Sequence, residues 1–240
     1  HVRPKNPQTR ATHHHPAVSP VGNRQTGQDL GPVLARLFFR QGAATLLSSA
    51  PRRRPPRGGS PIPIEMSFFV TTDFSSLALP AEQLSNLADL GYTTMTPIQA
   101  KALPLILQGC DVLAKAKTGS GKTAAFGIGL LARLEVSQYR TQALVLCPTR
   151  ELADQVSKEL RRLARATPNI KILTLCGGVP MGPQLDSLTH APHIVVGTPG
   201  RIQDHLHRHS LSLDHLQMLV LDEADRMLDM GFADVMVDVI

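Results

Sequence analysis

The stretch that decides the fold is AKTGSGKT, residues 116–123, which follows the short strand-like run DVLAKA at 111–116. Residues 123–134 after it are largely apolar and have the pattern of a helix. A glycine-rich loop between a strand and a helix lets backbone N–H groups curl around phosphate oxygens, and the helix dipole points its positive end at the same anion. The order strand, loop, helix therefore predicts a P-loop, with Ala116 where the strict pattern has glycine. A flexible Gly/Ser linker is the alternative, which the flanking elements disfavour.

Two side chains of this loop carry chemistry. Lys122 is expected to reach the outer phosphates of a bound nucleotide, and the Thr123 hydroxyl to ligate Mg²⁺. The residues expected to hold the nucleotide here are Ala116, Lys117, Thr118, Gly119, Ser120, Gly121, Lys122 and Thr123.

A second signature comes one hundred residues later, where the acidic run DEAD at 222–225 follows the strand-like run MLVL. A carboxylate at a strand end, here Asp222, is placed to hold Mg²⁺ through water. Glu223 beside it can orient or deprotonate the water that attacks a γ-phosphate. Acids that merely decorate a helix N-terminus are the alternative. The P-loop upstream favours catalytic roles for Lys122, Asp222 and Glu223.

The positive charge of the chain is concentrated in residues 1–65. Of 25 Lys and Arg and 19 Asp and Glu in 240 residues, this segment holds ten basic and two acidic residues, a net charge of +8, and the remainder carries −2. The segment is rich in Pro, Arg, Ser, Gly and Thr, so we expect a disordered basic leader. The charge is no sign that the folded part attracts nucleic acid, although such a tail could add nonspecific affinity.

The origin of the leader has three explanations. The chain begins with His1, whereas Met66 opens a segment that runs smoothly into the domain, which favours translated upstream sequence with the true start at Met66. An Arg-rich, acid-poor stretch is also typical of an organelle transit peptide. A natural disordered tail is the third.

Cysteine usage and hydropathy bear on the compartment. Cys110, Cys147 and Cys176 lie in or beside strand-like runs without CxxC spacing, so we expect buried, reduced thiols in a cytoplasmic protein. No apolar stretch reaches the roughly 18 to 20 residues that span a bilayer.

From Met66 onward, strand-like and helical patterns alternate. Continuous Val, Leu and Ile runs are typical of strands buried on both faces, hence of an α/β fold with a mostly parallel sheet and helices on each side. The clearest helix is 151–166, whose charged faces (Lys158, Arg161, Arg162, Arg165) favour a solvated surface over an RNA patch. The expected strands are 111–116, 142–148, 171–177, 193–199 and 218–223.

Ligands of such sheets bind beyond the carboxyl ends of the strands. The loops PTREL at 148–152, CGGVP at 176–180 and TPGR at 198–201 all follow strands there. Each alone is ordinary turn chemistry. Together they suggest a second binding track rich in backbone N–H groups, with Arg150 and Arg201 as cations for phosphates.

These motifs, together with TPIQ at 96–99, closely resemble in order and spacing those of the DEAD-box ATP-dependent RNA helicases, over about residues 68–240. The resemblance implies a RecA-like P-loop domain, divided as a Q-motif region at 66–100 and a partial ATP-binding domain at 101–240, with ATP and Mg²⁺ as cofactors. Within the family, stretches 142–165 and 222–232 look most like a bacterial group that acts on ribosomal RNA. RNA binding and a link to ribosome biogenesis are thus implied.

The resemblance also implies roles for individual residues. Gln99 would read adenine, because an amide offers both an acceptor and a donor. Tyr92 or Phe74 would contact the base, and Asp225 would couple the nucleotide site to the RNA track. Single-stranded RNA would be held by its backbone through Pro148, Thr149, Arg150, Gly178, Thr198, Pro199, Gly200 and Arg201.

The chain also departs from the family pattern. A Ser-Ala-Thr strand and a second RecA-like domain with catalytic arginines would follow Asp225, and the sequence up to Ile240 has neither. An arginine finger is worth roughly 10³ to 10⁵ in rate, so we expect this part alone to hydrolyse ATP very slowly and to unwind nothing. The absent strand would lie between the P-loop strand and the DEAD strand. We expect its loss to leave a central gap and an unstable fragment.

Two other functions stay open from the residues alone. One is a non-catalytic ATP or RNA tether. The other is an unrelated P-loop enzyme such as a DNA translocase, which Gln99 disfavours. RNA specificity and oligomeric state do not follow from the sequence.

Overall fold

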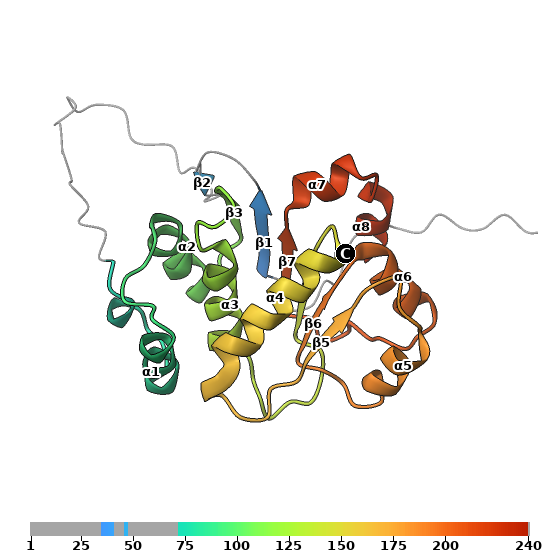
Figure 1. The fold of residues 1–240 in the computed structure, drawn as a ribbon, viewed down its shortest axis with the longest axis horizontal. Helices are drawn as coiled ribbons and strands as arrows, with labels where there is room; N and C mark the ends of the chain where they lie inside the picture. Colours follow the sequence, from blue (N-terminus) through green and yellow to red (C-terminus); the bar gives the residue numbers. More distant parts are fainter. Residues whose placement is uncertain (1–34, 41–45, 48–71, 240) are drawn as a thin grey trace, which may run out of the picture. The chain divides into compact units, whose positions relative to one another are not determined.

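The computed structural model describes residues 35–40, 46–47 and 72–239, the first two segments by their backbone alone. Within this part, strands and helices alternate along the chain from residue 97 onward, and the helices lie on both faces of a sheet (Figure 1). The prediction of a RecA-like α/β domain with a mostly parallel sheet is confirmed.

The described strands form one sheet in the order β2-β3-β1-β7-β4-β6-β5. Pairing is parallel throughout except between β2 and β3. The strands are β1 Ala35–Arg40, β2 Leu46–Leu47, β3 Val112–Lys115, β4 Ala143–Leu146, β5 Ile172–Leu175, β6 Ile194–Gly197 and β7 Met218–Asp222.

All five predicted strands are present, each slightly shorter than expected. In β4 and β7 every residue is buried, as continuous apolar runs indicate. Successive side chains point to opposite faces, so Val145 and Val220 belong to one hydrophobic cluster and Leu144 and Leu219 to the other. β5 ends the sheet and is only half-buried.

The first four α-helices contribute to the hydrophobic cluster on one face of the sheet, and the last four contribute to the cluster on the other. The predicted helix at 151–166 corresponds to α4 and the short 3₁₀ turn after it. The helices are α1 Ala81–Asp89, α2 Pro97–Leu107, α3 Lys122–Arg133, α4 Arg150–Leu163, α5 Gly182–Leu188, α6 Pro199–His207, α7 Ala224–Asp229 and α8 Ala233–Val239, with 3₁₀ turns η1 Phe74–Ser76 and η2 Ala164–Ala166.

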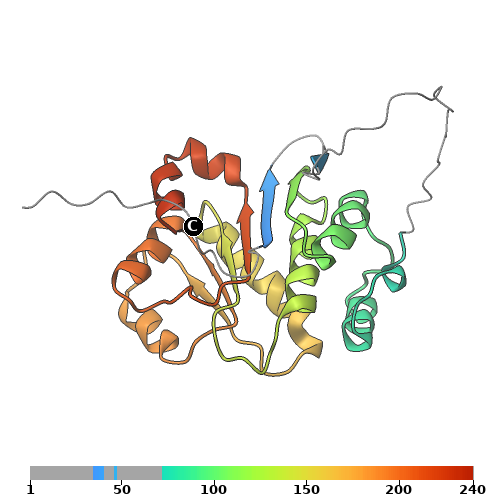
Figure 2. The same ribbon diagram turned by 180° about the vertical axis from the view of Figure 1, so that it is seen from behind.

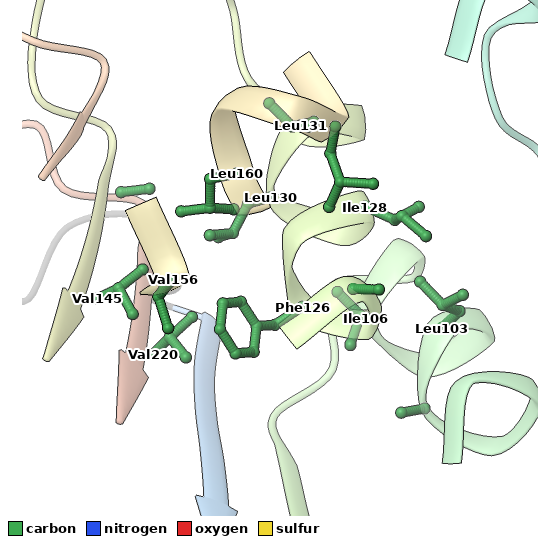
Figure 3. Packing of buried hydrophobic residues seen from close by; sticks show 14 of the residues in the cluster. Leu103, Ile106, Phe126, Ile128, Leu130, Leu131, Val145, Val156, Leu160 and Val220 are labelled. Atoms are coloured by element: carbon green, nitrogen blue, oxygen red, sulfur yellow. The ribbon is translucent and has the colours of Figure 1, made fainter. Parts of the chain in front are cut away.

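The core between α3, α4 and the sheet centres on Phe126, which is fully buried. Its ring points from α3 toward Val156 of α4 and Val220 of β7 (Figure 3). Ile128, on the same helix, faces α2. Complete burial of a phenylalanine side chain stabilises a fold by about 1.5–3 kcal/mol, so this cluster fixes where α3 begins and therefore where the P-loop lies.

The sequence did not predict the strand at the centre of the sheet. β1 comes from the basic segment before residue 66 and pairs in parallel with both β3 and β7, with Phe38 opposite Leu113 and Leu221 (Figures 1 and 2). The expected gap between the P-loop strand and the DEAD strand is therefore filled. The predicted disorder of the rest of the leader, and the start at Met66, lie outside the described residues.

Two further expectations concern thiols and membranes. Cys147 and Cys176 are buried as predicted, and burial raises the pKa of both. Cys110 is exposed, so its predicted burial was wrong: it follows the end of α2 in a turn and not in a strand. Among the described residues, no helix is long and apolar enough to cross a bilayer.

Candidate functional site

The loop between β3 and α3 has the backbone of a phosphate-binding loop. Gly119 and Gly121 have φ angles of +79° and +90°, values that favour glycine. A Cβ on Gly121 would also lie 2.5 Å from Nε2 of Gln99. α3 begins directly afterwards at Lys122, so its first N–H groups face the loop. The arrangement is suited to hold an anion at the helix N-terminus.

Lys122 is folded over the loop that it terminates. Its Nζ donates a hydrogen bond to the carbonyl oxygen of Ala116 at 3.0 Å, and only 7% of the residue is exposed. An ammonium group has three donors, so this one bond leaves donors for phosphate oxygens. Ala116 contributes its carbonyl and does not line the neighbouring cavity.

Asp222 ends β7 and is 3% exposed. Its Oδ1 atom is buried without a hydrogen-bond partner among the described residues. Burial raises the pKa of the Asp222 carboxyl to about 6, an effect that the Lys122 ammonium opposes and Glu223 reinforces. A buried carboxylate oxygen of this kind is an effective ligand for a hard cation.

Glu223 has a strained backbone. Its φ of +54° and ψ of +47° lie in the left-handed region, which is unfavourable for residues with a Cβ. Its side chain is 8% exposed, and its Oε2 lies 3.3 Å from Nη1 of Arg226 one turn along α7. Strain in a buried acidic residue is typical of functional positions, and it directs the carboxylate into the same cavity as Asp222.

A magnesium ion fits the donors of this site. Thr123 and Asp222 supply a hydroxyl and a carboxylate to one cavity, and Mg²⁺ binding sites commonly use one or two such protein oxygens with phosphates and water. Among the described residues no group of three His, Cys, Asp or Glu could hold a metal by itself.

The cavity that joins these residues has a volume of about 560 Å³. Its size suits a nucleotide-sized ligand. Of the residues predicted to bind the nucleotide, Phe74, Ala116, Lys117 and Ser120 do not line it. Those that do are Tyr92, Gln99, Thr118, Gly119, Gly121, Lys122, Thr123, Asp222 and Glu223.

Gln99 joins α2 to the P-loop. Its Oε1 accepts a hydrogen bond from the Thr96 N–H at 2.8 Å, which completes a capping box, and its Nε2 donates to the Gly121 carbonyl at 3.2 Å. A primary amide has two acceptor positions and two donors. One of each remains, which is the pair that adenine recognition requires.

Tyr92 is positioned by the end of α1. Gly91 adopts a φ of +82°, and the N–H groups of Gly91 and Tyr92 donate to the carbonyls of Ala88 and Leu87. This is the Schellman pattern of helix termination. Phe74 does not line the cavity: it is 4% exposed, and its ring packs edge-on against Tyr92 with centroids 6.2 Å apart. Of the two aromatic candidates for base contact, only Tyr92 lies at the cavity surface.

One wall of the cavity was missed from the sequence. Gln155, Lys158, Glu159 and Arg162 of α4 line it. Their spacing places them on one helix face. Lys158 and Arg162 are exposed as predicted, but the sequence did not predict that this face borders a cavity. The sequence predicted the buried apolar stripe of α4. It could not predict which polar face of α4 packs near α1, because that depends on tertiary packing.

The predicted RNA track lies outside this cavity, at the carboxyl ends of β4, β5 and β6. Thr149 caps α4 by accepting from the Leu152 N–H at 3.3 Å, and Thr198 precedes α6. Arg150 lies against Gly178, where a Cβ would collide with its guanidinium. The Arg201 guanidinium donates to the Val179 carbonyl at 3.1 Å.

The other predicted members of the track have simple positions. Pro148 precedes the cap of α4, and Pro199 and Gly200 form the first turn of α6. Asp225 lies in the first turn of α7 and does not line the cavity. The predicted track residues therefore lie at loop ends and helix starts, and none of them lines the cavity.

The raised pKa of Asp222 predicts how stability depends on pH. The folded-state pKa of about 6 exceeds the usual value of 3.8, so between these values the folded state binds more protons than the unfolded state. Stability therefore falls as pH rises from 4 to 6. We expect Asp222→Asn to flatten this dependence and to stabilise the ligand-free chain at pH 7 by about 2 kcal/mol.

Urea unfolding of both proteins at several pH values measures this effect. Asp214→Asn, an exposed carboxylate, is the control and should keep the wild-type profile. An Asp222→Asn protein with the wild-type profile would show that Asp222 is ionised normally.

The family model described as DEAD/DEAH box helicase matches residues 96–240, and the chain belongs to that family. It is 68% identical over 170 residues to the ATP-dependent RNA helicase DbpA of Escherichia coli (strain K12), a match that covers 70% of this chain and 37% of that protein.

Two other relatives agree. The DEAD-box ATP-dependent RNA helicase CshA of Geobacillus kaustophilus is 47% identical over 68% of this chain and 35% of its own length. The crystal structure of a DEAD box protein from the hyperthermophile Methanococcus jannaschii superimposes with a TM-score of 0.65 at 38% identity, over 70% of this chain and 46% of that one. The chain thus spans about a third of the length of these curated relatives.

Proposed function

We propose that this chain is the ATP-binding part of an ATP-dependent RNA helicase that couples ATP hydrolysis to RNA binding and duplex remodelling. The observation that carries the proposal is the cavity that joins the P-loop, the two acidic residues at the end of β7 and the amide of Gln99. Residues 66–100 form its Q-motif region, and residues 101–240 the partial ATP-binding domain.

Each residue of the cavity has its own role in ATP hydrolysis. The glycine loop and the N-terminus of α3 hold the phosphates by backbone N–H groups, and Lys122 neutralises charge on the outer ones. Thr123 and Asp222 would hold Mg²⁺, which would supply Lewis-acid stabilisation of the transferred phosphoryl group. Glu223 accepts a proton from the attacking water or orients it. Gln99 donates to and accepts from adenine.

RNA is held by its sugar-phosphate backbone along the strand-end track, with Arg150 as an exposed cation. Backbone contacts carry no base information, so selection is for RNA geometry rather than sequence. Asp225 links the track to the nucleotide site. We propose ribosomal RNA as the substrate, ribosome biogenesis as the process and the cytoplasm as the location, as the motif resemblance implies. Because an arginine finger is worth roughly 10³ to 10⁵ in rate, we propose that the 240 residues alone unwind nothing.

The proposed function is tested by measuring which nucleotide is hydrolysed and which nucleic acid stimulates the hydrolysis. In the complete gene product, we expect ATP to be hydrolysed in preference to GTP, CTP and UTP, and single-stranded RNA to stimulate hydrolysis more than DNA of the same sequence. Equal use of all four nucleotides, or equal stimulation by DNA, would support instead a P-loop enzyme of another class, such as a DNA translocase.

A further inference from the structure

The Tyr92 ring is held by three side chains from two parts of the fold. Its hydroxyl donates a hydrogen bond to Oε1 of Glu159 at 2.5 Å. Cζ of Arg162 lies 5.5 Å from the ring centroid, within the range of a cation–π contact. Phe74 packs edge-on behind the ring. Glu159 and Arg162 both line the cavity with Tyr92, whereas Phe74 does not.

Glu159 and Arg162 also hold each other. They are three residues apart on α4, and Nε of Arg162 lies 3.5 Å from Oε2 of Glu159. The Glu159 carboxylate thus uses one oxygen for the tyrosine and one for the arginine, and Arg162 contacts both partners. The three side chains form a closed set, so a change in one alters the position of the others.

The helix that carries the pair is rigidly placed. Val156, Leu160 and Leu163 of α4 are buried in the core. Asn86 of α1 donates to the Leu163 carbonyl at 2.7 Å, so α1 and α4 are already joined beyond the cavity. The contact between α1 and α4 therefore does not depend on Glu159 and Arg162. These two residues contact Tyr92 on the side of the cavity instead.

We propose that Glu159 and Arg162 are positioning residues that hold the Tyr92 ring as the base-binding wall of the cavity. This inference rests on the proposed function. The P-loop then sets affinity for the phosphates, and the polar face of α4 sets affinity for the base. Removing the pair should weaken ligands that have a base and spare ligands that have only phosphates.

The ionisation of Tyr92 supports this geometry. Burial raises the pKa of the Tyr92 hydroxyl to about 12, and both the hydrogen bond to Glu159 and its negative charge contribute, while Arg162 opposes the shift. The two neighbours therefore act on the phenol with opposite sign, which separates their contributions experimentally.

Titration calorimetry of the 240-residue chain with MgATP and with magnesium tripolyphosphate tests the proposal. We expect Arg162→Ala to weaken ATP binding about fivefold to tenfold, because a Tyr92 ring that is no longer held must be ordered when ATP binds, and to leave tripolyphosphate binding within about twofold. Arg162→Lys keeps the charge without the planar guanidinium and should restore part of the loss. Arg161→Ala, which removes a neighbouring charge that donates to the Ile172 carbonyl outside the cavity, is the matched control.

The other outcomes are distinguishable. Equal weakening of both ligands would show a general charge effect and overturn the proposal, as would unchanged ATP binding. A wild-type chain that binds tripolyphosphate but not ATP would overturn both this proposal and the proposed function. ATP binding that is equally strong in wild type and Arg162→Ala would overturn this proposal alone.

A spectroscopic pH titration of the tyrosines in the ligand-free chain measures the pKa of Tyr92 independently of nucleotide binding. The chain has two tyrosines, Tyr92 and Tyr139, and Tyr92→Phe assigns the signal. We expect Glu159→Gln to lower the pKa of Tyr92 toward its usual value of 10 and Arg162→Ala not to lower it. Burial is the largest cause of the raised pKa and remains in Glu159→Gln, so we expect a partial fall, and a Tyr92 pKa that is the same in Glu159→Gln and wild type would show that the carboxylate does not hold the ring.

Discussion

Replacing Lys122 with alanine is expected to lower kcat/KM for ATP hydrolysis in the complete gene product by about 10²- to 10³-fold, the usual cost of removing one fixed charge that stabilises a transition state. The Nζ atom lies at the P-loop, bonded to the Ala116 carbonyl. The substitution also removes the cation that holds down the pKa of the Asp222 carboxyl, so the metal ligand becomes harder to ionise. Both changes act on the phosphates and not on the base.

The control for this prediction is Lys101→Ala. Lys101 is an exposed residue of α2 that does not line the cavity, and its loss should leave hydrolysis unchanged. Circular dichroism of both variants checks folding, because Lys122 is largely buried. Hydrolysis by Lys122→Ala at the wild-type rate would show that the phosphates of ATP do not bind at this loop.

Phe38→Pro is expected to destabilise the chain by about 3 kcal/mol or more. Residue 38 is at the middle of β1, opposite Leu113 of β3 on one side and Leu221 of β7 on the other. Proline has no N–H to donate to the ladder and is excluded from central strands. Buried backbone groups left without partners cost about 1–3 kcal/mol each. β3 leads into the P-loop and β7 into Asp222, so nucleotide binding should fail with the sheet.

The matched comparison is deletion of residues 1–31, which leaves β1 in place. We expect the deletion to keep the wild-type midpoint in urea and Phe38→Pro to lower it sharply. Equal midpoints for wild type and Phe38→Pro would show that β1 does not contribute to the stability of the sheet.

The central strand shows where prediction from the sequence reached its limit. The runs that became β4, β6 and β7 are continuous and apolar, and burial on both faces requires that composition. The run ARLFFR at 35–40 is short and has an arginine at its second and last positions. Its partners lie more than seventy residues away, and nothing local specifies such pairing. The expectation of a gap rested on the strand order of the family's sheet, and it was wrong because residues 35–40 were not predicted to form a strand.

The sequence likewise predicted one part of the candidate site and missed another. Spacing of glycines, Lys122 and the two acids predicted the phosphate side, because loop chemistry is local. The roles of Arg162 and Glu159 were missed, because both sit among exposed charges on an amphipathic helix and only the packing of α1 on α4 brings them to Tyr92. Phe74 was assigned to the cavity although it packs behind Tyr92, a distinction that depends on side-chain burial.

The measurement that tests the central claim most directly is RNA-stimulated ATP hydrolysis by the complete gene product and its Glu223→Gln variant, with ATP binding measured on the same samples. Glutamine keeps the size of Glu223 and removes its ability to accept a proton. We predict that the variant binds ATP as the wild type does and loses RNA-stimulated hydrolysis by at least about 10²-fold. A Glu223→Gln protein that hydrolyses ATP with RNA at the wild-type rate would contradict the assignment of this cavity as the catalytic site.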